Sequence, residues 1–361
     1  MNQSPPSDRD AASASITAAA LGGFVRAAAM RTGLTDDAAA TLAEPLVLAD
    51  TMGVHTHGTK LLPGYLRKLL AGGYRPRAVP RIVREGPAWA VVDGQAALGQ
   101  IGCTMAMRLA IAKAKQTGVA SVAIRDTGHI GAAGFYALLA ARAGCLGIVT
   151  GNDTPSVAAP GSRGPVLGSN PLAWAAPRPD ADPLFFDIAT AAVAGGKVYA
   201  AVARGESIPP DWLIGDDGLP TTDGGLYPAK AALAPMAGHK GYGLAILAEL
   251  LSGVSSGGCV VTQVGSWMHD PPHEPSRHAA GFVVLDLAAI CEREAYAAAM
   301  NRLVREIHEA PTAAGVERVL LPGEREWARH RAAGDLGIAL PQDVREKLAA
   351  AAALVGMESP F

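Results

Sequence analysis

Two histidines in the segment Gly53–Gly58 are the first residues whose types and spacing suggest chemistry. An imidazole titrates near neutral pH, so it can donate or accept a proton in a catalytic step. The flanking glycines would let a small molecule approach closely. In extended chain His55 and His57 would lie on one side, where one could contact a substrate while the other is structural. A turn with two solvated histidines is the alternative.

A third histidine, His129, lies in the glycine-rich segment Thr127–Gly134 between a predicted strand and a predicted helix. A Rossmann fingerprint would need a tighter first pair of glycines and an acidic residue about 20 positions on, at the end of a second strand. No acid ends the strand found there, at residues 148–152. We therefore reject a Rossmann site. The segment instead predicts a helix N-terminus whose amides, with His129, suit an anion or a carbonyl oxygen.

Glycines and polar side chains recur between Asn152 and Lys197 and again around Lys240. The first stretch could line a nucleotide cleft, although loop packing is the simpler explanation. Lys240 would open a helix over Gly238–Ser252, where a cation is unfavourable unless it meets an anion. A phosphate or a carboxylate partner is therefore plausible at this helix.

Three further histidines lie close together in a proline-rich stretch with two acidic neighbours, which is a possible metal-binding cluster. They lack helical spacing, and the prolines among them predict an exposed loop. We therefore predict no metal site. The cluster consists of His269, Asp270, His273, Glu274 and His278.

The composition is that of a globular protein of 361 residues with a net charge of -2. No basic field is present to hold nucleic acid or an anionic membrane. The cysteines form no C-x-x-C pair, which favours reduced thiols in a reducing compartment. They are Cys103, Cys145, Cys259 and Cys291. No basic start with a continuous apolar run marks a signal sequence, so we expect a cytoplasmic protein whose first dozen residues are loose.

These segments belong to a chain that alternates predicted helices and strands. Apolar periodicity predicts helices over residues 13–29, 35–52, 61–70, 105–116, 132–143, 238–252 and 292–308, with a closing helical region to about residue 355. Short apolar runs predict strands over residues 88–93, 119–124, 146–150, 171–176, 184–188 and 280–287. The alternation predicts the α/β class, and by itself it suggests a parallel sheet.

Taken in order, seven motifs make the chain resemble the malate/lactate dehydrogenase type 2 family over about residues 39–327. That family includes ureidoglycolate, sulfolactate and 2,3-diketogulonate enzymes and Δ1-piperideine-2-carboxylate reductases. One motif would be a weak signal, but seven in the right order are specific. They are Thr56-His-Gly58 with Leu62-Pro-Gly-Tyr65, Gly128-His-Ile-Gly-Ala-Ala-Gly134, Leu167-Gly-Ser-Asn-Pro-Leu172, Phe186-Asp-Ile-Ala-Thr190, Pro220-Thr-Thr-Asp223, Gly238-His-Lys-Gly-Tyr-Gly-Leu244 and Leu321-Pro-Gly-Glu324.

The resemblance implies an oxidoreductase that moves hydride between NAD or NADP and a small 2-keto or 2-hydroxy acid. It implies a non-Rossmann dinucleotide-binding domain with a mostly antiparallel sheet, over residues 126–324. A helix-rich substrate domain over residues 16–125 would be completed by residues 325–361, and residues 1–15 would be disordered. The resemblance also implies a homodimer with the active site in the cleft between the domains.

By position, the resemblance identifies His57 as the catalytic acid–base group, with His129 as its rival. The substrate-side positions are matched by Thr56, Lys60, Ser169 and Gly195. The cofactor positions are matched by Asn152, Thr154, Asp187, Ile188, Ala189, Thr190, Lys240, Gly241, Gly323, Glu324 and Arg325.

One residue departs from the family's pattern. The usual motif is Ser-His-Gly-x-x-Arg, whose arginine pairs with the substrate carboxylate, but this chain has Leu61 at that position. Leucine cannot pair with a carboxylate. Either a neighbouring cation such as Lys60 substitutes, or the substrate differs from the usual 2-keto acid. A reductase of cyclic imino acids and a catalytically silent nucleotide-binding paralogue remain alternatives.

Overall fold

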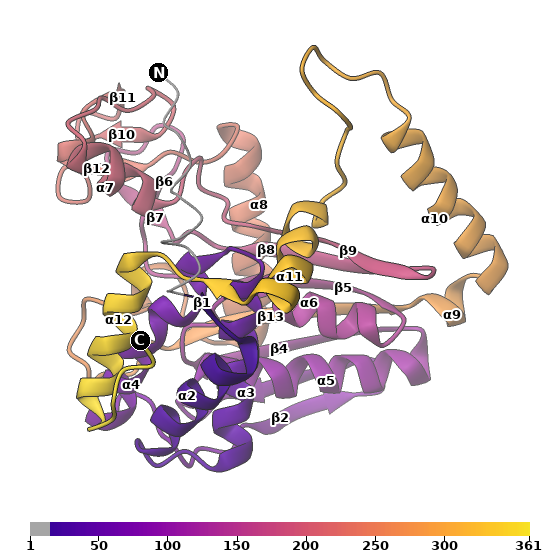
Figure 1. Cartoon of the computed structure of the whole chain (residues 1–361), viewed down its shortest axis with the longest axis horizontal. Helices are drawn as coiled ribbons and strands as arrows, with labels where there is room; N and C mark the ends of the chain where they lie inside the picture. The colour runs from indigo at the N-terminus through magenta and orange to yellow at the C-terminus, as the bar shows by residue number, and fades with distance from the viewer. Residues whose placement is uncertain (1–14) are drawn as a thin grey trace.

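A seven-stranded sheet forms the centre of the computed structural model, which describes residues 15–361 (Figure 1). Its strands lie in the order β2, β3, β4, β13, β5, β8 and β9. In that order they span Arg81–Gly86, Trp89–Asp93, Val119–Thr127, His278–Asp286, Cys145–Gly151, Leu172–Arg178 and Ala181–Ile188. Strands β3 and β4 run parallel, and every other neighbouring pair of this sheet is antiparallel.

The parallel sheet suggested by the alternation of strands and helices is wrong, and strand β13 is the reason. The unit β4–α6–β5, in which helix α6 spans Ala133–Arg142, does bring two strands into the same direction, as the alternation predicted. Strand β13 arrives from more than a hundred residues later in the chain and inserts between them, antiparallel to both. The mostly antiparallel sheet that the resemblance implied is confirmed.

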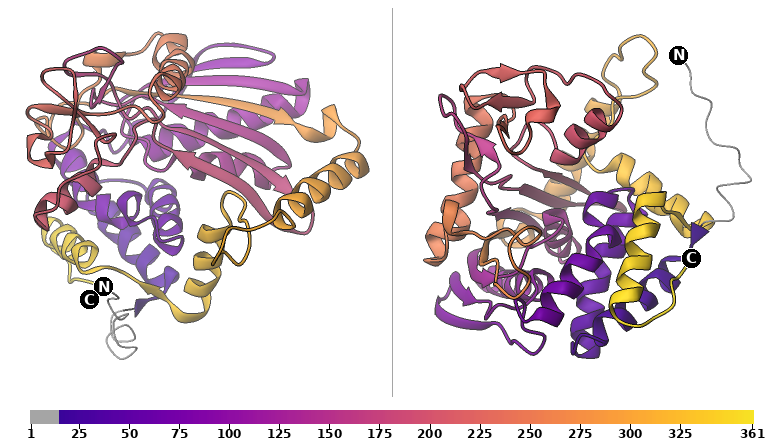
Figure 2. Two further views of the ribbon diagram at one scale, coloured as in Figure 1. Left: turned by 90° about the horizontal axis from the view of Figure 1, so that it is seen from above. Right: turned by 90° about the vertical axis from the view of Figure 1, so that its left-hand side faces the viewer.

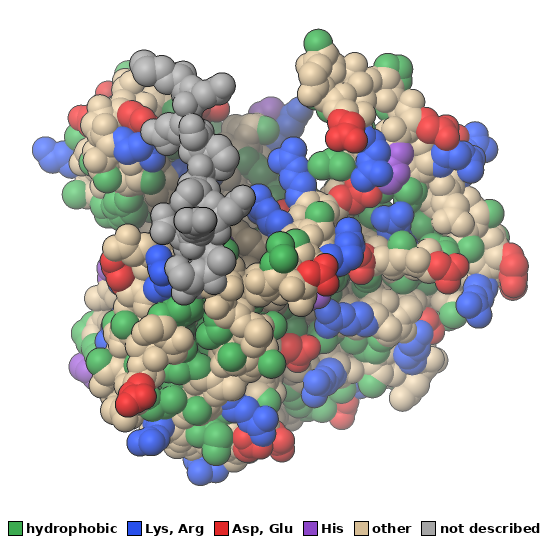
Figure 3. Space-filling view, viewed as in Figure 1, with side chains coloured by type: hydrophobic (Ala, Val, Ile, Leu, Met, Phe, Trp, Pro, Cys, Tyr) green, Lys and Arg blue, Asp and Glu red, His purple; other side chains and the backbone are tan. Residues whose placement is uncertain are grey.

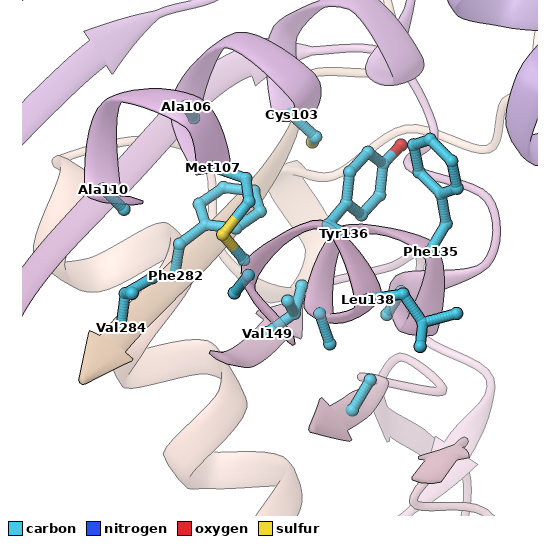
Figure 4. Close-up of a cluster of buried hydrophobic side chains, with 14 of the residues drawn as sticks. Cys103, Ala106, Met107, Ala110, Phe135, Tyr136, Leu138, Val149, Phe282 and Val284 are labelled. Carbon is cyan, nitrogen blue, oxygen red and sulfur yellow. The ribbon is translucent and has the colours of Figure 1, made fainter. Parts of the chain in front are cut away.

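Helices α5 (Gly99–Thr117) and α6 (Ala133–Arg142) cover one face of this sheet. Their side chains meet those of β13 in the main hydrophobic core, where Met107, Tyr136 and Phe282 are fully buried (Figure 4). Because strand residues alternate between faces, residue 281 faces the other way. There the helix α8 (His239–Glu249) and its π-helical continuation (Leu250–Val254) pack against the sheet.

Both ends of the described chain contribute to a separate helical unit beside the sheet (Figures 1 and 2). Its helices are α2 (Ala18–Met30), α3 (Asp36–Thr51), α4 (Leu62–Ala71) and α12 (Gln342–Leu354), joined by α11 (Glu324–Leu336) and by the strand pair β1 (Ser15–Ile16) and β14 (Ile338–Ala339). The Thr35 side chain caps α3 by accepting the amide hydrogen of Ala38. Gly72 ends α4 with a left-handed backbone. The helix-rich unit built from both chain ends is thus confirmed.

A small lobe and a C-terminal excursion complete the fold (Figure 2). The lobe holds a five-stranded sheet in the order β11, β10, β12, β6 and β7, with helix α7 against it. These elements span Pro220–Thr221, Leu213–Gly215, Ala231–Leu233, Val157–Ala158, Pro165–Leu167 and Gly195–Ala203. The excursion comprises α9 (Leu287–Ile290), α10 (Arg293–His308) and the loop 309–323. Across residues 15–361, no helix is both long and apolar enough to span a membrane.

The predicted division of the chain at residue 125 passes through the large sheet. Strands β2, β3 and most of β4 precede that position, yet they hydrogen-bond within the same sheet as β13. A division that keeps this sheet whole would fall before Arg81. The predicted disorder of residues 1–15 lies almost entirely outside the described residues, and Ser15 pairs with Ala339.

Candidate active site

A cavity of about 1600 Å³ is lined by residues of the large sheet, the small lobe and the helical unit. Ligand pockets for drug-sized molecules usually measure roughly 300–1,000 Å³, so this cavity has room for a dinucleotide beside a small acid. Lys and Arg side chains gather around the hollow seen in Figure 3. Lys197, Arg318 and Arg325 belong to the cavity wall. Such cations suit the phosphates of a nucleotide.

His57 reaches the cavity wall from a short 3-10 helix, His55–His57, which follows α3. The expected extended conformation is therefore wrong, because the buried carboxylate of Asp50 draws the chain into a turn. Asp50 bonds His55 Nδ1 at 2.9 Å and accepts hydrogen bonds from the amide and the hydroxyl of Thr59 at 2.8 and 2.6 Å. His55 is thus held by Asp50, while His57 is exposed on the wall.

Gly58 permits this turn. A Cβ atom at this position would lie 2.1 Å from Oδ1 of Asp50, too close for any side chain. Because Asp50 is only 2% exposed, its carboxylate cannot move away into solvent. The glycine predicted to give a ligand access therefore serves first to hold the histidine turn against α3.

His129 stands opposite, in the loop before α6, within a cage of aromatic rings. The indole of Trp267 stacks on it at 4.6 Å between ring centroids, and its Nδ1 lies 2.9 Å from the hydroxyl of Tyr65. Burial lowers the pKa of His129 to about 3. Burial also raises the pKa of Tyr65, so the phenol keeps its proton. His129 is therefore a neutral imidazole at physiological pH.

The rings of His57 and His129 face each other across a narrow space, with centroids 6.4 Å apart. Nδ1 of His57 bonds the hydroxyl of its neighbour Thr56 at 3.1 Å. Within residues 15–361, Nε2 of neither ring has a hydrogen-bond partner. The two Nε2 atoms are thus available to a ligand that lies between or beside the rings.

Asp187 lies close to His57 and caps helix α6. Its Oδ2 accepts the amide hydrogen of Gly134 at 2.7 Å, and a Cβ atom on Gly134 would press against it at 3.0 Å. Burial raises the pKa of Asp187, while the Gly134 hydrogen bond and a positive charge on His57 lower it.

A second carboxylate, Asp153, also faces the cavity and is held by a buried histidine. Its Oδ1 lies 3.1 Å from Nε2 of His278 and accepts the amide hydrogen of Thr154 at 2.8 Å. Its Oδ2 accepts the hydroxyl hydrogen of Ser169 at 3.1 Å. Burial works to raise the pKa of Asp153, but the hydrogen bond and charge of His278 bring it below the ordinary aspartate value.

A chain of hydrogen bonds continues from His278 to the backbone of His129. Nδ1 of His278 lies 2.9 Å from the hydroxyl of Ser276, which lies 3.0 Å from the hydroxyl of Tyr74. That hydroxyl accepts the amide hydrogen of His129 at 3.1 Å. Each of the bridging side chains is buried. The chain thus couples the position of His129 to that of Asp153.

Most of the residues predicted for the site lie on the cavity wall. Besides the two histidines these are Thr56, Lys60, Asn152, Thr154, Ser169, Asp187, Ile188, Ala189, Gly195, Gly323 and Arg325. Asn152 and Thr154 direct their polar groups into the protein: the Asn152 amide bonds the backbone of Cys259 and Ala279, and the Thr154 hydroxyl donates to the carbonyl of Val264. They therefore anchor the loop that carries Trp267.

Four of the predicted cofactor residues are not brought to the wall. Thr190 is fully buried and donates its hydroxyl hydrogen to the carbonyl of Ser169. Lys240 is exposed on the first turn of α8, and a Cβ on Gly241 would lie 2.2 Å from the carbonyl oxygen of Met236. The fourth, Glu324, binds Nε2 of His308 at 2.9 Å, and so closes the base of the cavity-lining loop 309–323.

The structure separates the histidines of the supposed metal cluster. The exposed loop predicted there holds for His269 and His273, but is wrong for His278, which is fully buried at the start of β13. Pairing with β4 and the bond to Asp153 draw it inside. In the part of the chain that the structure describes, no three His, Cys, Asp or Glu side chains are grouped to hold a metal ion.

Leu61 and Lys60 both reach the wall beside His57. Nζ of Lys60 is paired with Oδ2 of Asp343 on α12 at 2.6 Å. Leu61 is half-buried against the core of the helical unit. Lys60 therefore has a carboxylate partner of its own before any substrate binds, and does not stand free in place of an arginine.

Sequence reasoning missed several residues that shape the site. Asp153 stands between two residues that were singled out, Asn152 and Thr154, and its charge beside them was a usable signal. Trp267 had no local signal, because only the fold brings it onto His129. Its place depends on Gly64, where a Cβ atom would lie 2.6 Å from the indole ring.

Comparison with known proteins supports the family resemblance that the sequence motifs indicated. The model of the malate/L-lactate dehydrogenase family matches residues 16–349. A malate dehydrogenase from Pyrococcus horikoshii is 34% identical over 342 residues, which cover 93% of this chain and 94% of the relative. A ureidoglycolate dehydrogenase (NAD(+)) from Escherichia coli strain K12 is 36% identical, covering 88% of this chain and 89% of that protein.

A solved structure resembles the whole fold. The delta1-piperideine-2-carboxylate reductase from Pseudomonas syringae superposes with a TM-score of 0.83 at 30% identity, covering 94% of this chain and 99% of that one. Sequence motifs, fold and comparisons thus agree, and the chain belongs to the malate/L-lactate dehydrogenase family.

Proposed function

We propose that the protein is a nicotinamide-dependent oxidoreductase that interconverts a small 2-keto acid and its 2-hydroxy acid. The observation that carries the proposal is the pair His57 and His129, whose rings face each other on the wall of a dinucleotide-sized cavity and whose Nε2 atoms have no hydrogen-bond partner within residues 15–361. Membership of a dehydrogenase family supports the same reaction class.

In this proposal His57 moves the proton. During reduction its imidazolium donates a proton from Nε2 to the substrate oxygen as that oxygen gains negative charge. During oxidation the neutral ring accepts the hydroxyl proton. His129 is too weak a base to share this role, because burial lowers its pKa to about 3. With Tyr65 donating to Nδ1, its Nε2–H serves as a neutral hydrogen-bond donor that orients the substrate oxygen.

The cavity fits a nicotinamide dinucleotide in size and in the groups it presents. Apolar Phe135, Leu138 and Phe185 offer surfaces for rings, and the cations of the wall suit the pyrophosphate. When bound, the cofactor supplies or accepts the hydride. Ile188, Gly323 and Arg325 would contact it. The choice between NAD and NADP is left to the assay below.

Leu61 favours a substrate outside the usual 2-keto acids. A carboxylate gains both energy and orientation from an arginine, and Leu61 provides neither. Lys60 is already paired with Asp343. A cyclic imino acid is the second candidate substrate, and the similarity to the Pseudomonas syringae reductase favours including it.

The proposal also includes a cytoplasmic homodimer. The four cysteines are free thiols, as a reducing compartment would maintain them. Leu247, Leu250 and Val254 form an exposed apolar stripe along α8 and its continuation, which a second copy could cover. Light scattering of the wild type and of Leu250→Glu tests the dimer: a monomeric wild type would refute it.

The activity is tested by following oxidation of NADH and of NADPH with pyruvate, oxaloacetate and a cyclic imino acid in parallel. We expect His57→Asn to lower kcat by about a hundredfold or more, as loss of a general acid–base group does, while the Kd for reduced cofactor stays within about twofold. Full activity of His57→Asn would overturn the proposed role. Cofactor binding by the wild type without any turnover would instead identify a silent paralogue.

A further inference from the structure

Asp153 is a cavity carboxylate for which neither the family comparison nor the proposed proton transfer has a role. A carboxylate has about four acceptor positions on its two oxygens. Three are occupied: His278 and Thr154 on Oδ1, and Ser169 on Oδ2. One position on Oδ2 is left, and the side chain is 27% exposed on a wall of the cavity.

The surroundings of Asp153 keep its carboxylate charged but provide no Lys or Arg side chain to pair with it. Within residues 15–361 its sole ionic contact is with His278, and no Lys or Arg lies within salt-bridge distance. His278 is fully buried and its Nδ1 is held by Ser276, so the carboxylate has a defined orientation. A charged acceptor that is partly removed from water is stabilised when a donor completes its hydrogen bonds.

The free position lies close to the reacting groups. His278, which holds Asp153, packs edge-on against the ring of His129 with centroids 5.7 Å apart. The charge of Asp153 is felt by His129 and by Tyr227, a further residue of the cavity wall. A ligand whose oxygen lies at His129 would therefore have its neighbouring atoms near Asp153.

We infer that Asp153 is a specificity residue, whose Oδ2 accepts a hydrogen bond from an N–H group of the ligand bound beside His129. The inference rests on the proposed function. Two sources supply this chemistry: an ammonium or amide group on the substrate, or the carboxamide of the nicotinamide ring. A negative charge here also disfavours a second carboxylate on the substrate, in keeping with Leu61 on the wall beside His57.

The test compares pairs of substrates of similar shape, of which one carries an N–H group and the other a methyl group at the same position. The first pair is isoserine, which carries an ammonium group, and 2-hydroxybutanoate, which carries a methyl group instead. The proteins are the wild type, Asp153→Asn, the charge-retaining Asp153→Glu, and Asp211→Asn as a matched control at an exposed carboxylate. Circular dichroism and urea midpoints establish that each is folded. We expect the wild type to favour isoserine in kcat/KM by about tenfold, the effect of one charge-assisted hydrogen bond. Asp153→Asn should lose this preference and Asp153→Glu should keep part of it.

Measuring the binding of NADH distinguishes a donor on the substrate from the carboxamide of the nicotinamide ring. If the carboxamide is the donor, Asp153→Asn raises the Kd for NADH by about tenfold and lowers kcat/KM equally for both members of each pair. An unchanged Kd together with an unchanged substrate ratio would overturn the inference. If the wild type turned over none of the acids, the hydride-transfer proposal would be refuted instead. Calorimetric Kd values for the same substrate pairs, measured on the NADH-bound protein, would still test the role of Asp153.

Discussion

His129 should make the protein less stable in mild acid. Its pKa of about 3 in the folded state compares with about 6.5 in an unfolded chain. Between these values the unfolded chain binds a proton that the folded protein does not, so the free energy of unfolding falls as the pH falls. Linkage gives a loss of about 2 kcal/mol between about pH 7 and pH 5. Because the side chain of His129 lines the cavity and is only partly buried, about 1–2 kcal/mol is the figure to expect.

The perturbation that isolates this effect is His129→Asn, with the exposed His273→Asn as the matched control. Urea unfolding at the two pH values gives the difference in free energy between each variant and the wild type. Whatever His129→Asn costs in packing at about pH 7, that cost should shrink by about 1–2 kcal/mol at about pH 5, because the variant no longer carries the penalty. The difference for His273→Asn should stay constant. A His129→Asn difference that is the same at both pH values would refute the assignment of a neutral imidazole to His129.

Three other substitutions test the geometry around His57. Gly58→Ala should cost about 2 kcal/mol or more in unfolding free energy and lower kcat, because its Cβ would meet the Asp50 carboxylate; Gly23→Ala, which meets nothing within 4 Å, is the control. Lys60→Met should change kcat/KM by less than about threefold, since the partner of Lys60 is Asp343. A larger loss would indicate that Lys60 contacts the substrate. Leu61→Arg should raise kcat/KM for pyruvate by about tenfold or more through a new charge-assisted pair, and no gain would show that another group already holds the carboxylate.

The sequence was sufficient for most of the local elements. Apolar periodicity with clear end signals located α3, α4, α6 and α10 to within about two residues, because caps and glycines act over a single turn. The start of α5 was missed by six residues, since Gly99 and Gly102 weaken the periodic signal. These glycines are required by packing: a Cβ on Gly99 would lie 2.2 Å from the carbonyl oxygen of His129.

Long-range contacts were out of reach of residue patterns. The insertion of β13 between β4 and β5 depends on residues more than a hundred positions apart, and the family resemblance indicated only that the sheet is mostly antiparallel. The pairing of Asp153 with His278 spans 125 residues. A pattern of proline and histidine around residue 278 looked like exposed loop, because nothing local revealed the buried partner.

Helix α12, which carries the Asp343 partner of Lys60, affects when the protein can fold during its synthesis. Helix α12 packs against the segment just after His57, and its apolar face fills the core beneath it. During synthesis the N-terminal helices emerge early, yet they lack this cover until α12 leaves the ribosome. A chain that stops short of Gln342 would expose that core and leave the histidine turn without its support. Full activity therefore requires that α12 has been synthesised, and a bulky insertion next to α12 would act close to the reacting groups.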